Sequence, residues 1–275
     1  MTSSPAAACA AFRALHEQGC FILPNPWDVG SARYLHSLGF KALATTSSGM
    51  AWSQGQPDGG AGLEAVLAHL RTMAAATPLP LNADFENGYA ADADGVARNV
   101  RRAVDTGVAG LSIEDSTGNP ADPLFPIEVA VDRLRAARRA IDGAGSGTLL
   151  VGRAENFFAG RPDLDDAIAR LRAYADAGAD CLYAPGIRTR EQIAAVVAAV
   201  APKPVNLLVG ATSELGLDDI AALGVRRISV GGALARSAWG GFMQAAQALA
   251  QGRLDTAFAG AAAGNQLNAL FAPRP

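Results

Sequence analysis

The chain alternates between two hydrophobic patterns, and this alternation constrains its fold more than any other feature. Eight short runs of apolar or β-branched residues are separated by longer stretches with apolar residues at every third or fourth position. The short runs predict β-strands, and the longer stretches predict helices with one apolar face. The predicted strands are residues 20–23, 42–46, 81–84, 110–113, 149–153, 181–184, 205–209 and 227–230. The clearest predicted helices are residues 63–76, 95–106, 127–142, 164–177 and 190–200.

Residues typical of helix ends fall where this alternation requires them. Asp163 and Thr189 stand where helices are expected to begin and are good N-caps. Gly107, Gly178 and Gly224 each come just before a predicted strand, as glycines that end a helix do. The predicted strands and helices therefore alternate with well-marked boundaries.

Eight strand–helix units close most simply into a (β/α)₈ barrel, because crossovers between parallel strands are right-handed. The 275 residues fit one such domain and a short remainder. We expect a barrel domain at residues 1–252 and a helical tail at 253–275, which is either exchanged between subunits or covers the bottom of the barrel. An open doubly wound sheet is the alternative. No Gly-x-Gly-x-x-Gly pattern follows the first strand, where residues 24–28 read PNPWD, so a dinucleotide cofactor is not indicated.

Composition argues against two classes of partner. The formal net charge is −3 and 18% of residues are charged, so no basic surface for nucleic acid is expected. No run of about 20 apolar residues could span a bilayer, and the N-terminal residues lack the pattern of a secretory signal. We therefore expect a cytoplasmic enzyme that binds neither nucleic acid nor membrane.

Several residue types common in catalysis are scarce or poorly placed. Three scattered cysteines do not form a disulfide or zinc pattern, so we interpret them as reduced packing residues. Three histidines lie in predicted helices, where we expect them to be partly exposed. The two lysines precede strands, away from the expected site, which disfavours a Schiff-base mechanism. These residues are Cys9, Cys20, Cys181, His16, His36, His69, Lys41 and Lys203.

Carboxylates gather where predicted strands end, which is the face of a barrel that carries active sites. Asp84 and Glu86 stand two residues apart, so both side chains can point toward one ion, and Glu114 ends the next strand. Oxygen ligands without a nearby histidine or cysteine suit Mg²⁺ or Mn²⁺. The alternative is that these acids cap helices or bind loop amides.

Two further segments predict an anion site. Residues 45–50 combine hydroxyls with a glycine, so Ser48 and nearby backbone N–H groups could hold a carboxylate. Arg153 ends the fifth strand, and its guanidinium could hold a substrate carboxylate or an enolate oxygen. A buried ion pair of Arg153 with Glu155 or Glu114 is the alternative interpretation.

Taken together, six segments resemble the isocitrate lyase and phosphoenolpyruvate mutase superfamily. They are residues 46–49, 55–58, 84–89, 113–115, 152–155 and 227–231, in an order that spans nearly the whole chain. The resemblance implies a (β/α)₈ barrel, Mg²⁺, and a 2-oxo acid or its enolate as ligand. It also implies a homo-oligomer, either a tetramer with swapped C-terminal helices or a dimer.

The resemblance also implies roles for individual residues. Asp84 would bind the metal directly, while Glu86 and Glu114 would bind it through water or complete its shell. The expected catalytic residues are Asp58, Arg153 and Glu114. The expected substrate-binding residues are Ser48, Gly49, Met50, Asp84, Arg153, Tyr183 and Asn206. Ser213 is a further candidate for a contact with the distal end of the substrate.

One loop departs from the pattern of the superfamily. Lyases that cleave isocitrate or methylisocitrate carry a Lys-Lys-Cys-Gly-His stretch after the fourth strand. Here the corresponding residues 116–126 contain no cysteine, histidine or lysine. This absence disfavours an ordinary isocitrate lyase, and the lack of positive charge disfavours phosphoryl migration. Tyr183 is either a substitute proton donor or a core residue.

The sequence therefore predicts a Mg²⁺-dependent C–C lyase for a small 2-oxo or 2-hydroxy dicarboxylate, acting by retro-aldol cleavage or decarboxylation through an enolate. A P–C bond enzyme of the phosphoenolpyruvate mutase or phosphonopyruvate hydrolase type is one alternative. A protein that binds a 2-oxo acid without turning it over is another.

Overall fold

The computed structural model describes residues 4–272, so the outer ends of the expected domain ranges, 1–3 and 273–275, lie outside the described residues. Eight parallel strands form one sheet in the order β1-β8-β7-β6-β5-β4-β3-β2. The Ala44 backbone N–H donates to the Pro24 carbonyl at 3.0 Å, which links the two outer strands. The predicted (β/α)₈ barrel is confirmed. Its strands are β1 Phe21–Leu23, β2 Leu43–Ala44, β3 Leu81–Asp84, β4 Gly110–Glu114, β5 Leu149–Arg153, β6 Cys181–Tyr183, β7 Val205–Leu208 and β8 Arg227–Ser229.

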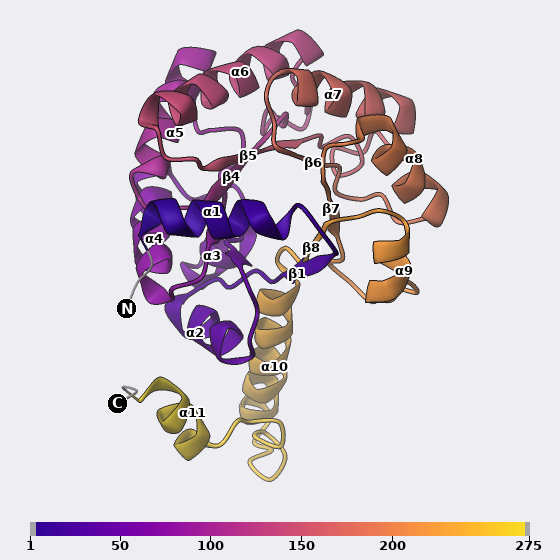
Figure 1. The fold of residues 1–275 in the computed structure, drawn as a ribbon. Helices are drawn as coiled ribbons and strands as arrows, with labels where there is room; N and C mark the ends of the chain where they lie inside the picture. Colours follow the sequence, from indigo (N-terminus) through magenta and orange to yellow (C-terminus); the bar gives the residue numbers. More distant parts are fainter. Residues whose placement is uncertain (1–3, 273–275) are drawn as a thin grey trace.

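Helices alternate with these strands and cover the outside of the barrel (Figure 1). Asp163 and Thr189 cap helices as predicted, and Gly107, Gly178 and Gly224 have the positive φ expected after a helix. The helices are α1 Pro5–Leu15, α2 Val29–Ser37, α3 Ser47–Ser53, α4 Leu63–Ala76, α5 Ala93–Val104, α6 Ile127–Ala144, α7 Leu164–Asp176, α8 Arg190–Val200, α9 Leu217–Ala222, α10 Ala233–Ala250 and α11 Gly264–Phe271.

Among the described residues, buried hydrophobic side chains form three clusters, and the two larger ones hold these layers together. The main core lies between the strands and the surrounding helices and contains buried residues such as Leu67, Val100, Leu111 and Ile193. A smaller core lies under α1, which crosses one end of the barrel and buries Phe12 (Figure 1). Because α1 covers the end where the strands begin, the cavity of the barrel opens where they finish.

The inside of the barrel is unusually polar. Barrel interiors are normally filled by branched apolar side chains. In this chain, strand residues with polar side chains are buried at neighbouring positions of the sheet. They are Asn82, Ser112, Asn206, Arg227 and Ser229.

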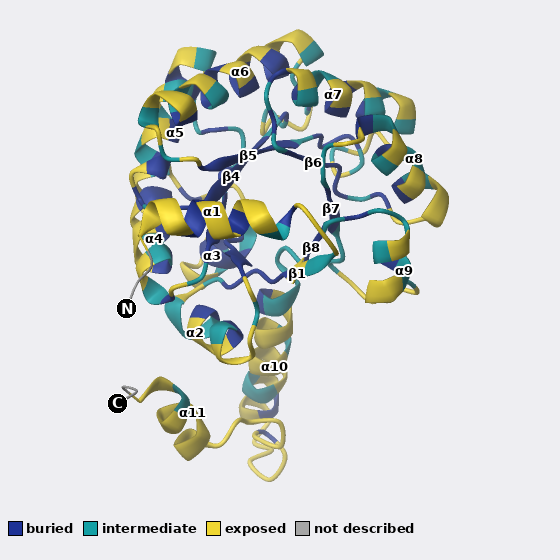
Figure 2. Cartoon of the chain, viewed as in Figure 1, coloured by how far each residue is buried: buried dark blue, intermediate teal, exposed yellow. Residues whose placement is uncertain are grey.

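The C-terminal helices leave the barrel. Figures 1 and 2 show α10 projecting away from it, with most of its surface exposed. Only Ala235 and Ala248 of this helix are buried, and several of its large apolar side chains face outward. The α11 segment lies against α2, where the Phe271 ring approaches Gly30. The exposed large apolar side chains of α10, α11 and the segment between them are Trp239, Phe242, Met243, Leu249, Leu254, Phe258, Leu267 and Phe271.

Some local expectations need correction. His16 is buried at the end of α1 instead of partly exposed, because its ring packs edge-on against Phe12 and Phe21. The segment after β2 forms the short helix α3, since the Thr46 side chain caps it by accepting from the Gly49 N–H. Cys9 and Cys181 are free and buried, and Cys20 is free and partly buried, which agrees with their interpretation as packing residues.

Candidate active site

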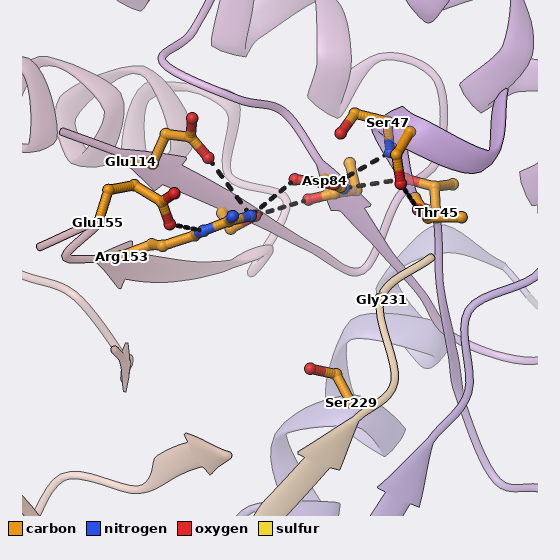
Figure 3. Close-up of polar contacts among 12 residues, drawn as sticks. Thr45, Ser47, Asp84, Glu114, Arg153, Glu155, Ser229 and Gly231 are labelled. Carbon is orange, nitrogen blue, oxygen red and sulfur yellow. Dashed lines mark hydrogen bonds and ion pairs between the residues drawn. The ribbon is translucent and has the colours of Figure 1, made fainter. Parts of the chain in front are cut away.

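Three strand ends bring carboxylates around one partly buried arginine (Figure 3). Arg153 at the end of β5 places its Nη1 3.4 Å from Asp84 Oδ1 and 3.3 Å from Glu114 Oε2. Its Nε donates to Glu155 Oε1, which approaches from the following loop. Asp84 ends β3 and Glu114 ends β4, so the barrel joins residues that are far apart in sequence. The strand ends therefore bring these side chains together, and the ion pairs that the alternative interpretation expected between Arg153 and Glu114 or Glu155 are present.

The charges of this cluster depend on burial. Burial raises the pKa of Glu114 well above its usual range, although Arg153 opposes the shift. Burial likewise raises the pKa of Glu155 against the opposing effect of Arg153. The surrounding carboxylates outweigh burial at Arg153 and hold its pKa above that of a free arginine. The guanidinium therefore stays charged. The acids around it share this one positive charge, which only partly offsets the effect of burial on their pKa values.

Asp84 is also held from the side of β2. The Thr45 hydroxyl lies 2.9 Å from the backbone nitrogen of Asp84, and the Ser47 N–H donates to Asp84 Oδ2 at 3.0 Å. Thr45 follows β2 directly, and Ser47 is the first residue of α3. These contacts fix the carboxylate before any ligand binds.

Only part of the expected carboxylate cradle faces the cavity. Ser48 lines the cavity, and its hydroxyl lies 3.0 Å from that of Thr46. Gly49 and Met50 are buried, and their backbone N–H groups already donate to the Thr46 hydroxyl and carbonyl. A side chain at Gly49 would come within 2.7 Å of Thr46 and 2.9 Å of Trp27, which explains the glycine by packing.

Asp58 lies on the loop between α3 and α4 and reaches the edge of the cavity. The Ser47 hydroxyl donates to Asp58 Oδ1 at 3.2 Å, and the Gly59 N–H donates to the same oxygen at 3.1 Å. Partial burial, followed by the charge of Asp84, raises the pKa of Asp58. Asp58 is therefore suited to exchange a proton with a ligand bound near Asp84.

Glu86 stands just beyond β3 in an uncommon backbone conformation. Its φ is 42°, and that of nearby Tyr89 is 52°, in the left-handed region that non-glycine residues rarely adopt. Glu86 Oε1 is buried without a hydrogen-bond partner among residues 4–272. Burial raises the pKa of Glu86 to about 7. The neighbouring Tyr89 hydroxyl is also buried without a partner in the described range, so this place has polar atoms that water or a cation could satisfy.

The donor set therefore fits a hard divalent cation. Asp84, Glu86 and Glu114 supply only oxygen ligands, as Mg²⁺ and Mn²⁺ prefer. Within the described part of the chain, no three His, Cys, Asp or Glu side chains converge closely enough to hold a metal by themselves. A cation bound here would therefore need water or substrate oxygens among its ligands. Mg²⁺ usually keeps several of its waters in protein sites.

A second buried network supports the site and was not predicted. Asp115, which follows β4, is 1% exposed and turns away from the cavity. Its Oδ2 accepts from Arg170 Nη1 at 3.0 Å and from the Tyr174 hydroxyl at 2.6 Å, while Oδ1 accepts from the Glu155 N–H at 2.8 Å. The network thus fixes the backbone beside Arg153. The four-residue spacing of Arg170 and Tyr174 on one helix was the available sequence signal.

The remaining predicted residues lie at different depths. Tyr183 is buried at the end of β6, with its ring 5.1 Å from the Arg153 guanidinium carbon, and burial raises its pKa to about 12. Asn206 is deeper in the barrel and donates to the Ser229 hydroxyl at 2.9 Å. Ser213 lies on an exposed loop and donates to the Leu215 carbonyl at 3.2 Å. The structure therefore does not bring Ser213 to the carboxylates, although it lines the outer cavity.

These residues surround one cavity of about 1180 Å³. Polar strand residues line its depth, and loops after β5, β6 and β7 form its rim, including Phe158, Arg188 and Thr212. Most of the loop after β4 is exposed, and its residues Ser116 and Leu124 pair as an isolated bridge. This volume accommodates a small dicarboxylate with room for a longer substituent.

Comparison with known proteins agrees with this arrangement. The model of the phosphoenolpyruvate phosphomutase family matches residues 12–250. The chain belongs to this family. A Burkholderia cenocepacia J2315 structure described as a candidate lyase/mutase is 48% identical with a TM-score of 0.94, and the match covers 98% of this chain and 97% of that one. The family assignment confirms the superfamily predicted from the six sequence segments.

Two further family members have named activities. The structure of oxaloacetate acetylhydrolase with the product oxalate is 29% identical with a TM-score of 0.86, over 98% of this chain and 95% of that one. An oxaloacetate decarboxylase from Bradyrhizobium sp. (strain ORS 278) is 36% identical over 171 residues, which are 58% of this chain and 54% of the relative. The match therefore spans about half the length of that decarboxylase. This phosphomutase-family protein is an enzyme of the isocitrate lyase and phosphoenolpyruvate mutase type.

The raised pKa of Glu86 predicts a measurable pH effect in metal-free protein. A folded-state pKa of about 7, above that of the unfolded chain, means that Glu86 takes up a proton on folding. Its contribution to stability should therefore be largest at low pH and be lost as the pH rises from about 4.5 to 7. Glutamine cannot titrate, so Glu86→Gln should not lose stability in this way. The difference between the unfolding free energies of wild type and variant should therefore change by up to about 1.4 kcal/mol per pH unit between pH 4.5 and 7.

Urea unfolding in the presence of a chelator, measured at several pH values, tests this prediction. The two proteins must be compared with each other, because the titration of buried His16 changes stability with pH in the opposite direction. Its pKa of about 3 makes stability rise with pH over an overlapping range. A difference that does not vary between pH 4.5 and 7 would contradict the assignment.

Proposed function

We propose that this enzyme is a Mg²⁺-dependent C–C lyase for a small 2-oxo or 2-hydroxy dicarboxylate. The observation that carries the proposal is Arg153, which contacts Asp84, Glu114 and Glu155 at the open end of the barrel. A fixed guanidinium beside an oxygen-rich cation site suits a substrate whose breaking bond leaves electrons on an enolate oxygen. The activities named for the oxaloacetate decarboxylase and acetylhydrolase relatives support the same substrate class.

Each residue has a role in this proposal. Asp84 would hold the cation, with Glu86 and Glu114 as further ligands or hydrogen-bond partners of its waters. When bound, Mg²⁺ would act as a Lewis acid toward the oxygens of the 2-oxo acid. Arg153 would bind the oxygen on which negative charge develops, and Ser48 would orient a carboxylate. Asp58, with its raised pKa, would exchange the proton that cleavage requires.

Two observations bear on the type of bond that is broken. The loop of residues 116–126 has no thiol, imidazole or lysine, so the acid–base group must come from elsewhere in the cavity. Tyr183 lies beside Arg153, but its high pKa favours a hydrogen-bond donor over a base. The same loop offers no positive charge to a phosphoryl group, which makes P–C chemistry the second candidate despite the name of the family.

Turnover assays of the metal-stripped protein test the function. Proton and phosphorus NMR would follow oxaloacetate, methylated oxaloacetate, isocitrate, methylisocitrate and phosphonopyruvate, each with and without Mg²⁺. We expect a Mg²⁺-dependent carboxylate product from a C–C substrate and its loss in Asp84→Ala. Unchanged activity of Asp84→Ala would refute the proposal. A new phosphorus product alone would favour the P–C alternative, and tight binding without turnover would favour a non-catalytic 2-oxo acid binding protein.

We also propose that the C-terminal helices are exchanged between subunits of a homo-oligomer, a tetramer or a dimer. The exposed apolar side chains of α10 and α11, together with the projection of α10 from the barrel, support this arrangement. Removing residues 253–275 should reduce the oligomer to smaller species in light scattering. A truncated protein with the mass of the full-length assembly would argue against exchange of this segment.

A further inference from the structure

The interior of the barrel contains an arginine with no acidic partner in the part of the chain that the structure describes. Arg227 is the first residue of β8, and only 2% of its surface is exposed. Its guanidinium has three neutral partners within the described range 4–272. Nε donates to Asn206 Oδ1 at 2.7 Å, and Nη1 lies 3.4 Å from Asn82 Oδ1 and 3.5 Å from His16 Nε2. A buried charge without a counter-charge is unfavourable, and burial accordingly lowers the pKa of Arg227.

His16 does not supply or remove charge in this cluster. Its Nδ1 lies 2.8 Å from the Phe12 carbonyl, so this nitrogen carries the proton. Nε2 therefore presents a lone pair to Arg227. Burial, and then the charge of Arg227, lower the pKa of His16 to about 3, so the ring is neutral near pH 7. The cluster carries one net positive charge.

Arg133 provides a comparison within the same chain. It is also buried and has no ion pair among the described residues. However, it donates to the carbonyls of Asn87, Ala90 and Ala91, and it does not line the active-site cavity. Arg227 does line that cavity. The two arginines differ in that only Arg227 is open to a ligand.

Neutral hydrogen-bonding groups surround this position. Asn82, Ser112, Asn206 and Ser229 line the cavity together with Arg227. Asn206 links two of these groups, because its Oδ1 accepts from Arg227 and its Nδ2 donates to the Ser229 hydroxyl. Figure 3 shows Ser229 at the end of β8, apart from the contacts around Arg153. Arg227 and Arg153 contact different side chains, so the deep position is separate from the carboxylate cluster at the mouth.

We propose that the polar interior of the barrel binds a small monovalent anion at Arg227. One guanidinium among amide and hydroxyl groups balances one negative charge. Only 2% of the Arg227 surface is exposed, which favours a small anion over a larger one. The chemistry suits a halide from solvent or an anion the size of bicarbonate. This site does not depend on the proposed lyase reaction.

Unfolding of the full chain at constant ionic strength tests the site. The reference salt is sodium gluconate, whose anion is too large for the position. It is replaced stepwise by sodium bromide, or by sodium bicarbonate at matched pH. We expect the unfolding temperature of wild type to rise linearly with the logarithm of anion concentration above the dissociation constant. Arg227→Met should lose this dependence, whereas Arg133→Met, which also removes a buried arginine, should keep it. The anion, bromide or bicarbonate, that raises the unfolding temperature more shows whether the site prefers a halide or bicarbonate.

Chloride NMR tests the site in the wild-type protein, so this test does not depend on whether a variant folds. Bound chloride should broaden the signal, and bromide or bicarbonate should reverse the broadening. Ser229→Ala, which retains Arg227, should weaken the effect. No broadening in wild type, or an unchanged anion response in a folded Arg227→Met protein, would overturn the proposal.

Discussion

Replacing Arg153 with methionine is expected to lower kcat/KM about 10³-fold for the dicarboxylate that the wild type cleaves, because removal of a fixed donor to a developing oxyanion has effects of this size. Methionine retains much of the apolar stem but has no charge and no hydrogen-bond donor. The substitution also leaves Asp84, Glu114 and Glu155 without their shared positive partner. Steady-state kinetics at saturating Mg²⁺ would measure the change.

Arg153→Lys is the matched control, since it keeps the charge but not the two-pronged geometry of the guanidinium. We expect its activity to lie between those of wild type and Arg153→Met. Circular dichroism must show that both variants are folded. If folded Arg153→Met kept more than about a tenth of wild-type activity, Arg153 could not be the main group that stabilises the transition state.

Replacing Asp115 with alanine is expected to reduce the free energy of unfolding by about 3–5 kcal/mol, the range seen when one partner of a buried ion pair is removed. The change would leave Arg170 without its buried partner and would remove the acceptors of the Tyr174 hydroxyl and the Glu155 N–H. Urea unfolding of wild type and variant would measure the difference.

Two variants separate this effect from general loss of charge. Tyr174→Phe removes one hydrogen bond to the same carboxylate and should cost about 1.5–3 kcal/mol. Asp105→Ala breaks the exposed pair between Arg101 and Asp105 and should cost less than about 1 kcal/mol. Equal effects of Asp115→Ala and Asp105→Ala would show that the buried network does not stabilise the fold.

The sequence predicted the barrel because its pattern is local and repeated. Each strand is a short apolar run and each flanking helix has its own spacing, caps and terminal glycine, so neighbouring segments agree. Strand ends could shift by one or two residues without changing this conclusion, as β2 shows. Its predicted range was 42–46, whereas the strand spans Leu43–Ala44. The helix after β2 was missed because α3 has only seven residues and its cap, Thr46, resembles a residue of a strand.

The site was predicted in part for a related reason. In a parallel barrel all strands finish at one end, so acids at strand ends must converge whatever the details of packing. This topology is sufficient to bring Asp84, Glu114 and Arg153 together. It does not fix the direction of a side chain just beyond a strand. Glu114 and Asp115 are adjacent in sequence, yet one meets Arg153 and the other turns away to Arg170 and Tyr174.

The sequence by itself thus determined the barrel, the family and the convergence of acids with Arg153, since these depend on periodicity and strand order. Only the tertiary structure decided which charges are paired and how deeply they are buried. His16 and Arg227, separated by most of the chain, come within 3.5 Å of each other at the deep end of the cavity. Burial then sets their protonation, because the free energy of a charge depends on the solvent and partners around it. No local pattern specifies those surroundings.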